Sequence, residues 1–106
     1  MCHCLACQQR TGSVFGVQAR WPSERVTVDG QAHAYVRTGD EGGRATFRFC
    51  PTCGATVYYE LEALPGVVAV PVGAFADPNF PPPERSIYGE RRHPWVTTTL
   101  AIEELD

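Results

Sequence analysis

Lysine is missing from the sequence, and all nine basic residues are arginine. Schiff-base chemistry that depends on a lysine amine is therefore excluded, while the guanidinium groups suit fixed pairing with carboxylates. The basic residues are outnumbered by twelve acidic residues, which gives a formal net charge of -3. This balance opposes broad attraction to phosphate backbones, so nucleic acid is not an expected partner.

Long hydrophobic runs are also missing. The longest strongly apolar stretch runs from Val67 to Val72, far short of the ~20 residues that a membrane-spanning helix needs. No apolar segment follows a basic N-terminus, so we expect a soluble, unexported protein of the cytoplasm that does not bind membranes. A length of 106 residues without repeats or low-complexity segments predicts a single domain over residues 1–106.

What the sequence does contain is a series of short segments rich in Val, Thr, Tyr and Phe, separated by ten glycines and nine prolines. Such segments are typical of β-strands, and none shows the long periodicity of a helix, so the fold class is predicted to be mainly β with little helix. Strands are expected at residues 14–20, 25–28, 32–37, 45–49, 56–61, 67–72 and 96–102. One helical turn is expected at residues 21–24, a hairpin loop at 38–43 and an irregular loop at 77–83.

Aromatic side chains fall mostly within or beside these segments. Because aromatic rings bury large areas when strands pack, we expect them in the core or between sheets rather than on a binding platform. The residues concerned are Trp21, Phe47, Phe49, Tyr58, Tyr59 and Trp95.

Five cysteines fall into two groups. Cys2, Cys4 and Cys7 lie within six residues of one another, and Cys50 and Cys53 form a C-P-x-C-G knuckle. An odd number of cysteines at this tight spacing, without an export signal, favours metal thiolates over disulfides. Zinc is the metal expected at such a set of sulfur ligands.

Two arrangements give tetrahedral zinc coordination. In the first, Cys4 and Cys7 join Cys50 and Cys53 in one closed site, which leaves Cys2 unused. In the second, Cys2, Cys4 and Cys7 hold a zinc whose fourth position is open, and Cys50 and Cys53 belong to a separate metal. Spacing alone favours the closed site, which only stabilises a fold, whereas an open site can also support Lewis-acid chemistry.

Three motifs together resemble a known family. They are C-H-C-L-A-C-Q-Q-R-T-G-S over residues 2–13, C-P-T-C-G over residues 50–54, and R-R-H-P-W over residues 91–95. The sequence is similar to the glutathione-dependent formaldehyde-activating enzyme family (GFA), which also includes centromere protein V. The resemblance implies small antiparallel sheets joined around a zinc site, a fold described as a β-tent.

The same resemblance implies roles for the cysteines. It assigns Cys2, Cys4 and Cys7 to a catalytic zinc, and Cys50 and Cys53 to half of a structural zinc. Family members usually complete the structural site with a C-x-C-G strand upstream of the C-H-C motif. Here Cys2 directly follows Met1, so either that strand is missing or Cys50 and Cys53 recruit other ligands. The first arrangement, in which Cys4 and Cys7 join Cys50 and Cys53 in one site, therefore remains an alternative.

The family reaction joins glutathione to formaldehyde and gives S-hydroxymethylglutathione. The resemblance therefore implies a zinc-dependent carbon-sulfur lyase that binds glutathione or a related small thiol. Arg91, Arg92 and His93 are candidates for binding the carboxylates of such a peptide, or alternatively form a solvated segment paired with nearby acids. The alternative function is a non-catalytic, zinc-stabilised binding or scaffold module.

Overall fold

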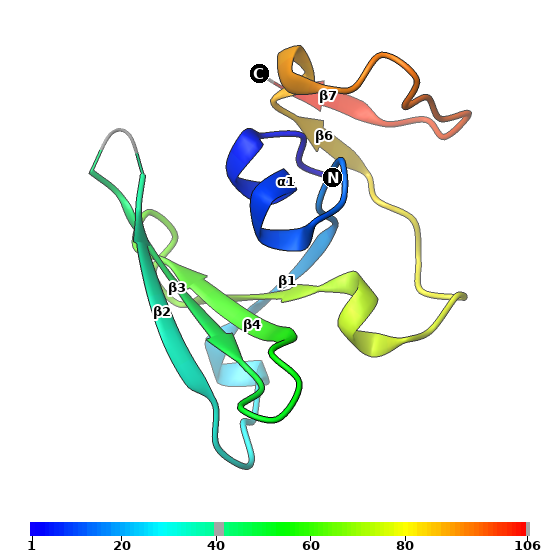
Figure 1. Ribbon diagram of the computed structural model, residues 1–106. Coiled ribbons are helices and arrows are strands. Elements are labelled where there is room, and N and C mark those ends of the chain that lie inside the picture. Colours follow the sequence, from blue (N-terminus) through cyan, green and yellow to red (C-terminus); the bar gives the residue numbers. More distant parts are fainter. Residues whose placement is uncertain (40–41, 106) are drawn as a thin grey trace. The chain divides into compact units, whose positions relative to one another are not determined.

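The computed structural model describes residues 1–39 and 42–105 (Figure 1). The fold is mainly β, as predicted. Its strands are β1 (Gln18–Pro22), β2 (His33–Thr38), β3 (Arg44–Phe49), β4 (Thr56–Leu61), β5 (Val67–Pro71), β6 (Arg85–Ile87) and β7 (Glu103–Leu105), and its α-helix is α1 (Leu5–Thr11). Three short 3-10 helices complete it: η1 (Ser23–Arg25), η2 (Val72–Phe75) and η3 (Gly89–Arg91). No helix in the described part of the chain is long and apolar enough to cross a membrane.

The chain forms two compact units. The first unit comprises residues 1–18 and the chain from residue 77 onward, and the second unit comprises residues 19–76. We describe each by itself, and the prediction of a single domain over residues 1–106 stays a prediction.

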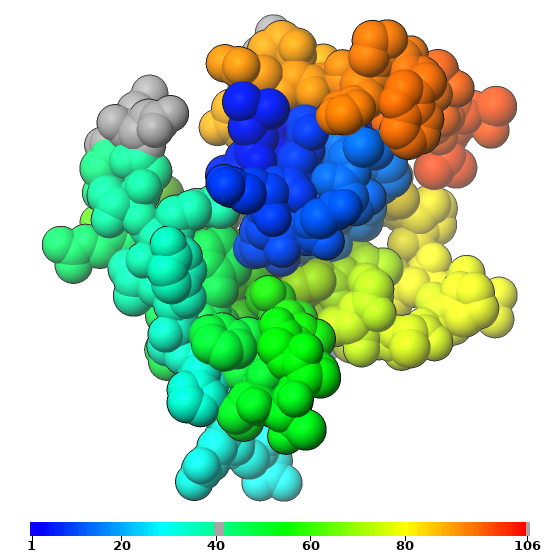
Figure 2. Space-filling view, in the orientation of Figure 1, coloured from blue at the N-terminus to red at the C-terminus, as the bar shows by residue number. Residues whose placement is uncertain are grey.

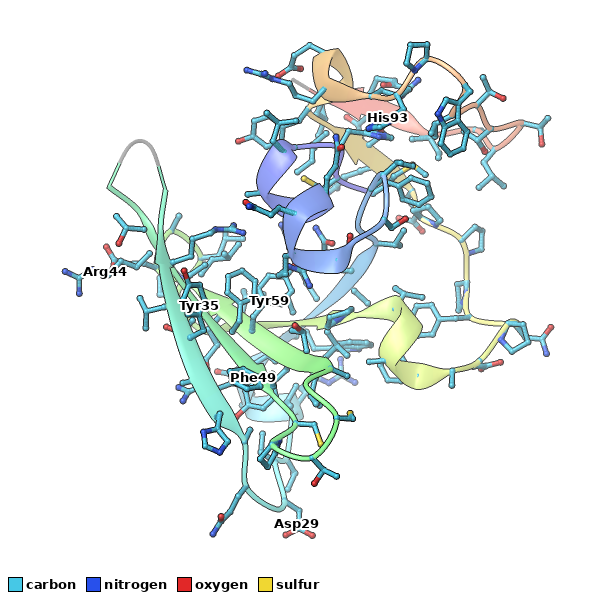
Figure 3. The ribbon with its side chains drawn as sticks, in the orientation of Figure 1. Asp29, Tyr35, Arg44, Phe49, Tyr59 and His93 are labelled. Atoms are coloured by element: carbon cyan, nitrogen blue, oxygen red, sulfur yellow. The ribbon has the colours of Figure 1, made fainter. Side chains whose placement is uncertain are left out.

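The second unit is built on a five-stranded sheet with the order β1-β5-β4-β3-β2. The pairs from β2 to β5 are antiparallel, and one row across the sheet brings Tyr35, Phe47, Tyr59 and Ala69 opposite one another. The rings of Phe47 and Tyr59 lie 4.9 Å apart, and with Ala45 and Ala69 they form the buried core of this unit. Tyr35, Phe49 and Tyr59 are labelled on these strands in Figure 3.

The first unit joins the two ends of the chain. Strands β6 and β7 pair in parallel, and the N-terminal stretch lies between two further partners: Cys2 bridges Gly16 on one side and Ile87 on the other. The backbone N–H of His3 donates to the carbonyl oxygen of Ile87 at 3.1 Å. In Figure 2 the blue atoms of the N-terminal segment accordingly lie against the orange atoms of the C-terminal segment.

Most of the strand predictions agree with the structure. Strands β2, β3, β4 and β5 occupy the predicted segments to within one residue at each end, and β1 overlaps the segment expected at residues 14–20. The strands expected at residues 25–28 and 96–102 are wrong. After η1, the exposed residues 27–32 have no partner strand, and β7 rather than residues 96–102 pairs with β6.

The expected turns and loops are largely found. Helix η1 overlaps the single helical turn predicted at residues 21–24, and residues 77–83 are irregular, with the Asp77 carboxylate accepting from the N–H of Asn79 at 2.9 Å. The predicted hairpin loop at residues 38–43 includes residues 40 and 41, which lie outside the described residues. Trp95 corrects the aromatic prediction, because 69% of its surface is exposed.

Helix α1 was not expected, because seven residues are too few to show a hydrophobic period. The sulfur of Cys4 caps its first turn by accepting from the N–H of Cys7 at 3.3 Å. Gly12 ends the helix with a φ of 71°, a left-handed conformation that glycine adopts without steric cost. A cysteine in the capping position thus begins the helix that carries the next cysteine of the motif.

Candidate metal centre

Three cysteine sulfurs meet in the first unit. The Sγ atoms of Cys2, Cys4 and Cys7 all lie within 4.8 Å of one another. Cys2 and Cys7 are only 3% and 8% exposed, and Cys4 is half-buried. The structure thus brings together the three ligands of the second, open arrangement.

Backbone interactions hold these sulfurs in place. Cys2 is fixed by two hydrogen bonds with Gly16, its N–H donating at 2.8 Å and its carbonyl accepting at 2.9 Å. Cys4 and Cys7 stand one helical turn apart at the start of α1, a spacing that puts their side chains on one face. A short extended segment at Cys2, followed directly by helix α1, therefore brings the three sulfurs of the C-x-C-x2-C motif together.

The sulfurs differ strongly in acidity. A hydrogen bond with Cys2 lowers the pKa of Cys7 to about 5, with further lowering by Cys4 and by the positive charge of Arg10. The same hydrogen bond, together with burial, raises the pKa of Cys2 above its ordinary value. The directions of the two shifts favour the thiolate at Cys7 and the neutral thiol at Cys2.

The residues present fit a metal ion. Thiolates around a tetrahedral zinc are separated by about 3.8 Å, so three sulfurs within 4.8 Å need only a small contraction. The N–H of Cys7 that donates to the Cys4 sulfur also supports a negative charge there. Cys2, Cys4 and Cys7 could thus hold a metal ion.

Cys50 and Cys53 lie in the second unit, on the turn between β3 and β4. The N–H of Thr52 donates to the Cys50 sulfur at 3.4 Å, and Gly54 takes a φ of 78° that turns the chain into β4. Backbone hydrogen bonds from Cys53 and Thr52 lower the pKa of Cys50. This is the turn predicted for a zinc knuckle, and its assignment to a structural zinc stays a prediction.

The predicted substrate-binding residues take different positions. Arg92 donates to both carboxylate oxygens of Glu104, at 2.8 and 2.9 Å, and to the hydroxyl of Ser86 at 3.3 Å. Arg91 is exposed, and His93, on the segment between β6 and β7, is half-buried (Figure 3). Arg92 is thus engaged within the protein, in agreement with the alternative of pairing with a nearby acid.

Gln8 ties the segment of His93 to helix α1. Its Nε2 donates to the carbonyl oxygens of His3 and Arg91, at 2.9 and 3.1 Å. Its Oε1 is therefore the acceptor for Nε2 of His93, at 2.9 Å, which fixes the proton of the imidazole on Nε2. Gln8 immediately follows Cys7, so the segment 91–93 lies beside the cysteine helix.

His3 occupies the interior of the first unit. It is fully buried, and its Nε2 lies 3.0 Å from the hydroxyl of Ser86. Burial and, second, the charge of Arg92 lower the pKa of His3, so the ring is neutral. Although His3 stands between two ligand positions in the sequence, its ring is turned toward β6.

Three contributors to the site were missed from the sequence: Gln8, Ser86 and Glu104. Ser86 and Glu104 act through partners far away along the chain, and no local pattern marks them. Gln8 had a usable indication, because its position directly after Cys7 on a helix would place it next to the cluster.

Together these features define a mainly β protein with a buried cluster of three cysteines, built where its two chain ends meet, that could hold a metal ion. The family model described as glutathione-dependent formaldehyde-activating enzyme matches residues 1–91, and the chain belongs to that family. The match includes all five cysteines and ends at Arg91. Membership supports, at the level of the family, a function that involves glutathione and formaldehyde. No curated protein matches the chain with significant similarity.

Proposed function

We propose that this protein is a zinc-dependent carbon-sulfur lyase that joins a small thiol such as glutathione to formaldehyde, or acts on a related thiol adduct. The observation that carries the proposal is the approach of three cysteine sulfurs to within 4.8 Å in a chain of this family. Cys2, Cys4 and Cys7 would hold the metal. When bound, zinc would supply a coordination position at which a substrate thiol loses its proton more readily.

The addition itself is balanced without an oxidant or a reductant. The glutathione sulfur forms a bond to the formaldehyde carbon, the C=O π bond breaks, and the thiol proton ends on the new hydroxyl oxygen. The chain has to bind the peptide, orient its sulfur and receive and return one proton. The charged groups beside α1 are the candidates for binding the peptide.

We assign Arg91 to the carboxylates of the peptide. His93 was also predicted to bind substrate; because its Nε2–H is bound to Gln8, we assign it to positioning the segment. Arg91 is exposed, and its segment is attached to α1 through Gln8. The same amide holds Nε2 of His93 in place, so Arg91 is presented from a fixed segment. Arg92 was also predicted to bind substrate; with both carboxylate oxygens of Glu104 bound, we assign it to positioning this segment.

The structural role of the second pair of cysteines belongs to the same proposal. We assign Cys50 and Cys53 to a second, structural zinc completed by further ligands. All five cysteines, each in the described part of the chain, are free thiols. Glutathione chemistry and free thiolate ligands both suit the reducing cytoplasm, where we place the protein.

The test combines metal stoichiometry with a thiol titration. The protein is loaded with cobalt, and glutathione is added while the sulfur-to-cobalt charge-transfer band is recorded. We expect the band to change with glutathione and to stay unchanged with S-methylglutathione, whose sulfur is blocked. An unchanged band with glutathione would overturn the proposal. A single metal whose binding needs Cys4, Cys7, Cys50 and Cys53 but not Cys2 would establish the non-catalytic module instead.

A further inference from the structure

Arg10 lies beside the cysteine cluster and has no part in the function proposed above. It follows Cys7 by three residues on α1, so the two side chains lie on neighbouring positions of one helix face. Its Nη2 lies 3.5 Å from the point where a Cβ of Gly16 would stand, and Cβ of Cys7 lies 3.6 Å from the same point. The guanidinium of Arg10 and the side chain of Cys7 therefore both lie over Gly16, which has no side chain to separate them.

Gly16 is buried, and both of its backbone polar groups are bonded to Cys2. Arg10 thus lies against the same residue that is hydrogen-bonded to the first cysteine of the cluster. The Nε atom of Arg10 is shielded from solvent. The helix α1, the Gly16 backbone and the Arg10 side chain therefore pack together beside the cysteine cluster.

The guanidinium is a positive charge close to the Cys7 side chain, because both groups reach the same point over Gly16. A hydrogen bond from a cation to a charged sulfur is stronger than one between neutral groups, particularly where water is excluded. Arg10 is therefore placed beside the third cysteine of the cluster.

The net charge of the metal site is the reason why a nearby cation would stabilise it. Three thiolates around a divalent ion leave one negative charge, and burial of an unpaired charge is costly. We propose that Arg10 is the positioning residue of the metal centre: its guanidinium supplies the missing positive charge at the Cys7 sulfur. This inference rests on the proposed function only in assuming that Cys2, Cys4 and Cys7 hold the metal.

Two consequences follow. Loss of the positive charge weakens the binding of the metal, because the net negative charge is no longer balanced. It also makes the Cys7 sulfur a stronger electron donor, which shifts sulfur-to-metal charge transfer to lower energy. A residue that only filled space beside Gly16 would affect neither quantity in this way.

The experiment uses zinc or cobalt alone, without glutathione. Zinc affinity is measured by competition with a chelator, and cobalt spectra are recorded for the full-length protein and for R10Q, R10K and R85Q. We expect R10Q to bind zinc roughly 10- to 100-fold more weakly, as is usual when an outer partner of a metal ligand is lost. Its charge-transfer band moves to longer wavelength. R10K, which keeps the charge, recovers most of the affinity.

R85Q is the matched control, because Arg85 is an exposed arginine of the same unit with 70% of its side chain accessible. It should bind metal like the unaltered protein. Equal affinity and an unshifted band in a folded R10Q would overturn the inference. So would an R10K protein as weak as R10Q, because that result would indicate shape rather than charge.

Gly16 provides a second test if R10Q does not fold. G16A adds a Cβ at an ordinary contact distance of 3.5 Å from the guanidinium and should leave the band in place. The branched side chain of G16V displaces the guanidinium and should shift the band as R10Q does; no shift would overturn the inference. Absence of cobalt binding in the unaltered protein would instead overturn the metal centre itself, so the two failures are distinguishable.

Discussion

The hydroxyl of Ser86 lies 3.0 Å from Nε2 of His3, and the two side chains are 1% and 0% exposed. Arg92 donates to the same hydroxyl oxygen, and Glu104 holds Arg92. This chain of polar contacts runs from Glu104 at the exposed edge of β7, through Ser86 on β6, to the buried residue between Cys2 and Cys4. It joins residues 83 positions apart at the base of the cysteine cluster.

Replacement of Ser86 by alanine should therefore destabilise the protein. His3 and Arg92 each lose a partner, and a buried polar atom without a partner costs about 1–3 kcal/mol. Urea unfolding, followed by circular dichroism, gives the change in free energy. Ser23→Ala, at an exposed position of η1, is the control and should alter stability by less than about 0.5 kcal/mol. Equal effects of the two substitutions would contradict this role for Ser86.

Two ion pairs of the β6 and β7 region should differ in strength. Arg92 contacts Glu104 at 2.8 Å with 29% of its side chain exposed, whereas Arg85 lies 3.6 Å from Glu103 with 70% exposed. Double-mutant cycles with glutamine should give a coupling of about 0.5–1 kcal/mol for the first pair and close to zero for the second. The first coupling should persist better in high salt, because the partly buried pair is less screened.

A cycle in which both pairs gave the same coupling would contradict the structural difference between them. The contrast matters for function as well. Arg92 holds the start of the segment that carries His93, in addition to the hydrogen bonds that this segment makes with Gln8.

Local contacts could be predicted from the sequence, and distant ones could not. Cys2, Cys4 and Cys7 lie within a stretch of six residues, so a short local segment is enough to bring their sulfurs together. The strands from β2 to β5 are rich in Val, Tyr and Phe and are separated by turn-forming residues. By contrast, β7 contains Glu103 and Glu104, and nothing in so polar a segment indicates a strand paired with β6.

Burial of single aromatic residues shows the same limit. Phe47 lies in a predicted strand and is buried because β2 and β4 lie on both sides of β3. Trp95 lies outside any strand and packs edge-on against His93, with ring centroids 6.1 Å apart. Its exposure depends on the path of residues 92–102, which no local preference determines.

Phe47 should be a main source of stability in the second unit. It is 5% exposed and packs against Tyr59, so Phe47→Ala should cost about 3–5 kcal/mol. Tyr35→Ala is a control at the opposite residue of the neighbouring strand, where 62% of the residue's surface is exposed. It should cost less than about 1 kcal/mol. Thermal unfolding of both variants checks the prediction, and a similar loss in each would contradict the assigned core.

Cys2→Ser should separate the metal centre from the fold. The hydrogen bonds of Cys2 with Gly16 are made by its backbone, so serine, which is similar in size, leaves them in place. The variant should keep its circular dichroism spectrum while losing the activity and the sulfur-to-cobalt band of a three-thiolate site. Cys53→Ser is the control, since Cys53 lies in the second unit and should leave that band intact. Collapse of the Cys2→Ser protein even without metal would show that Cys2 holds the architecture, and an intact band would show that the metal relies on other ligands.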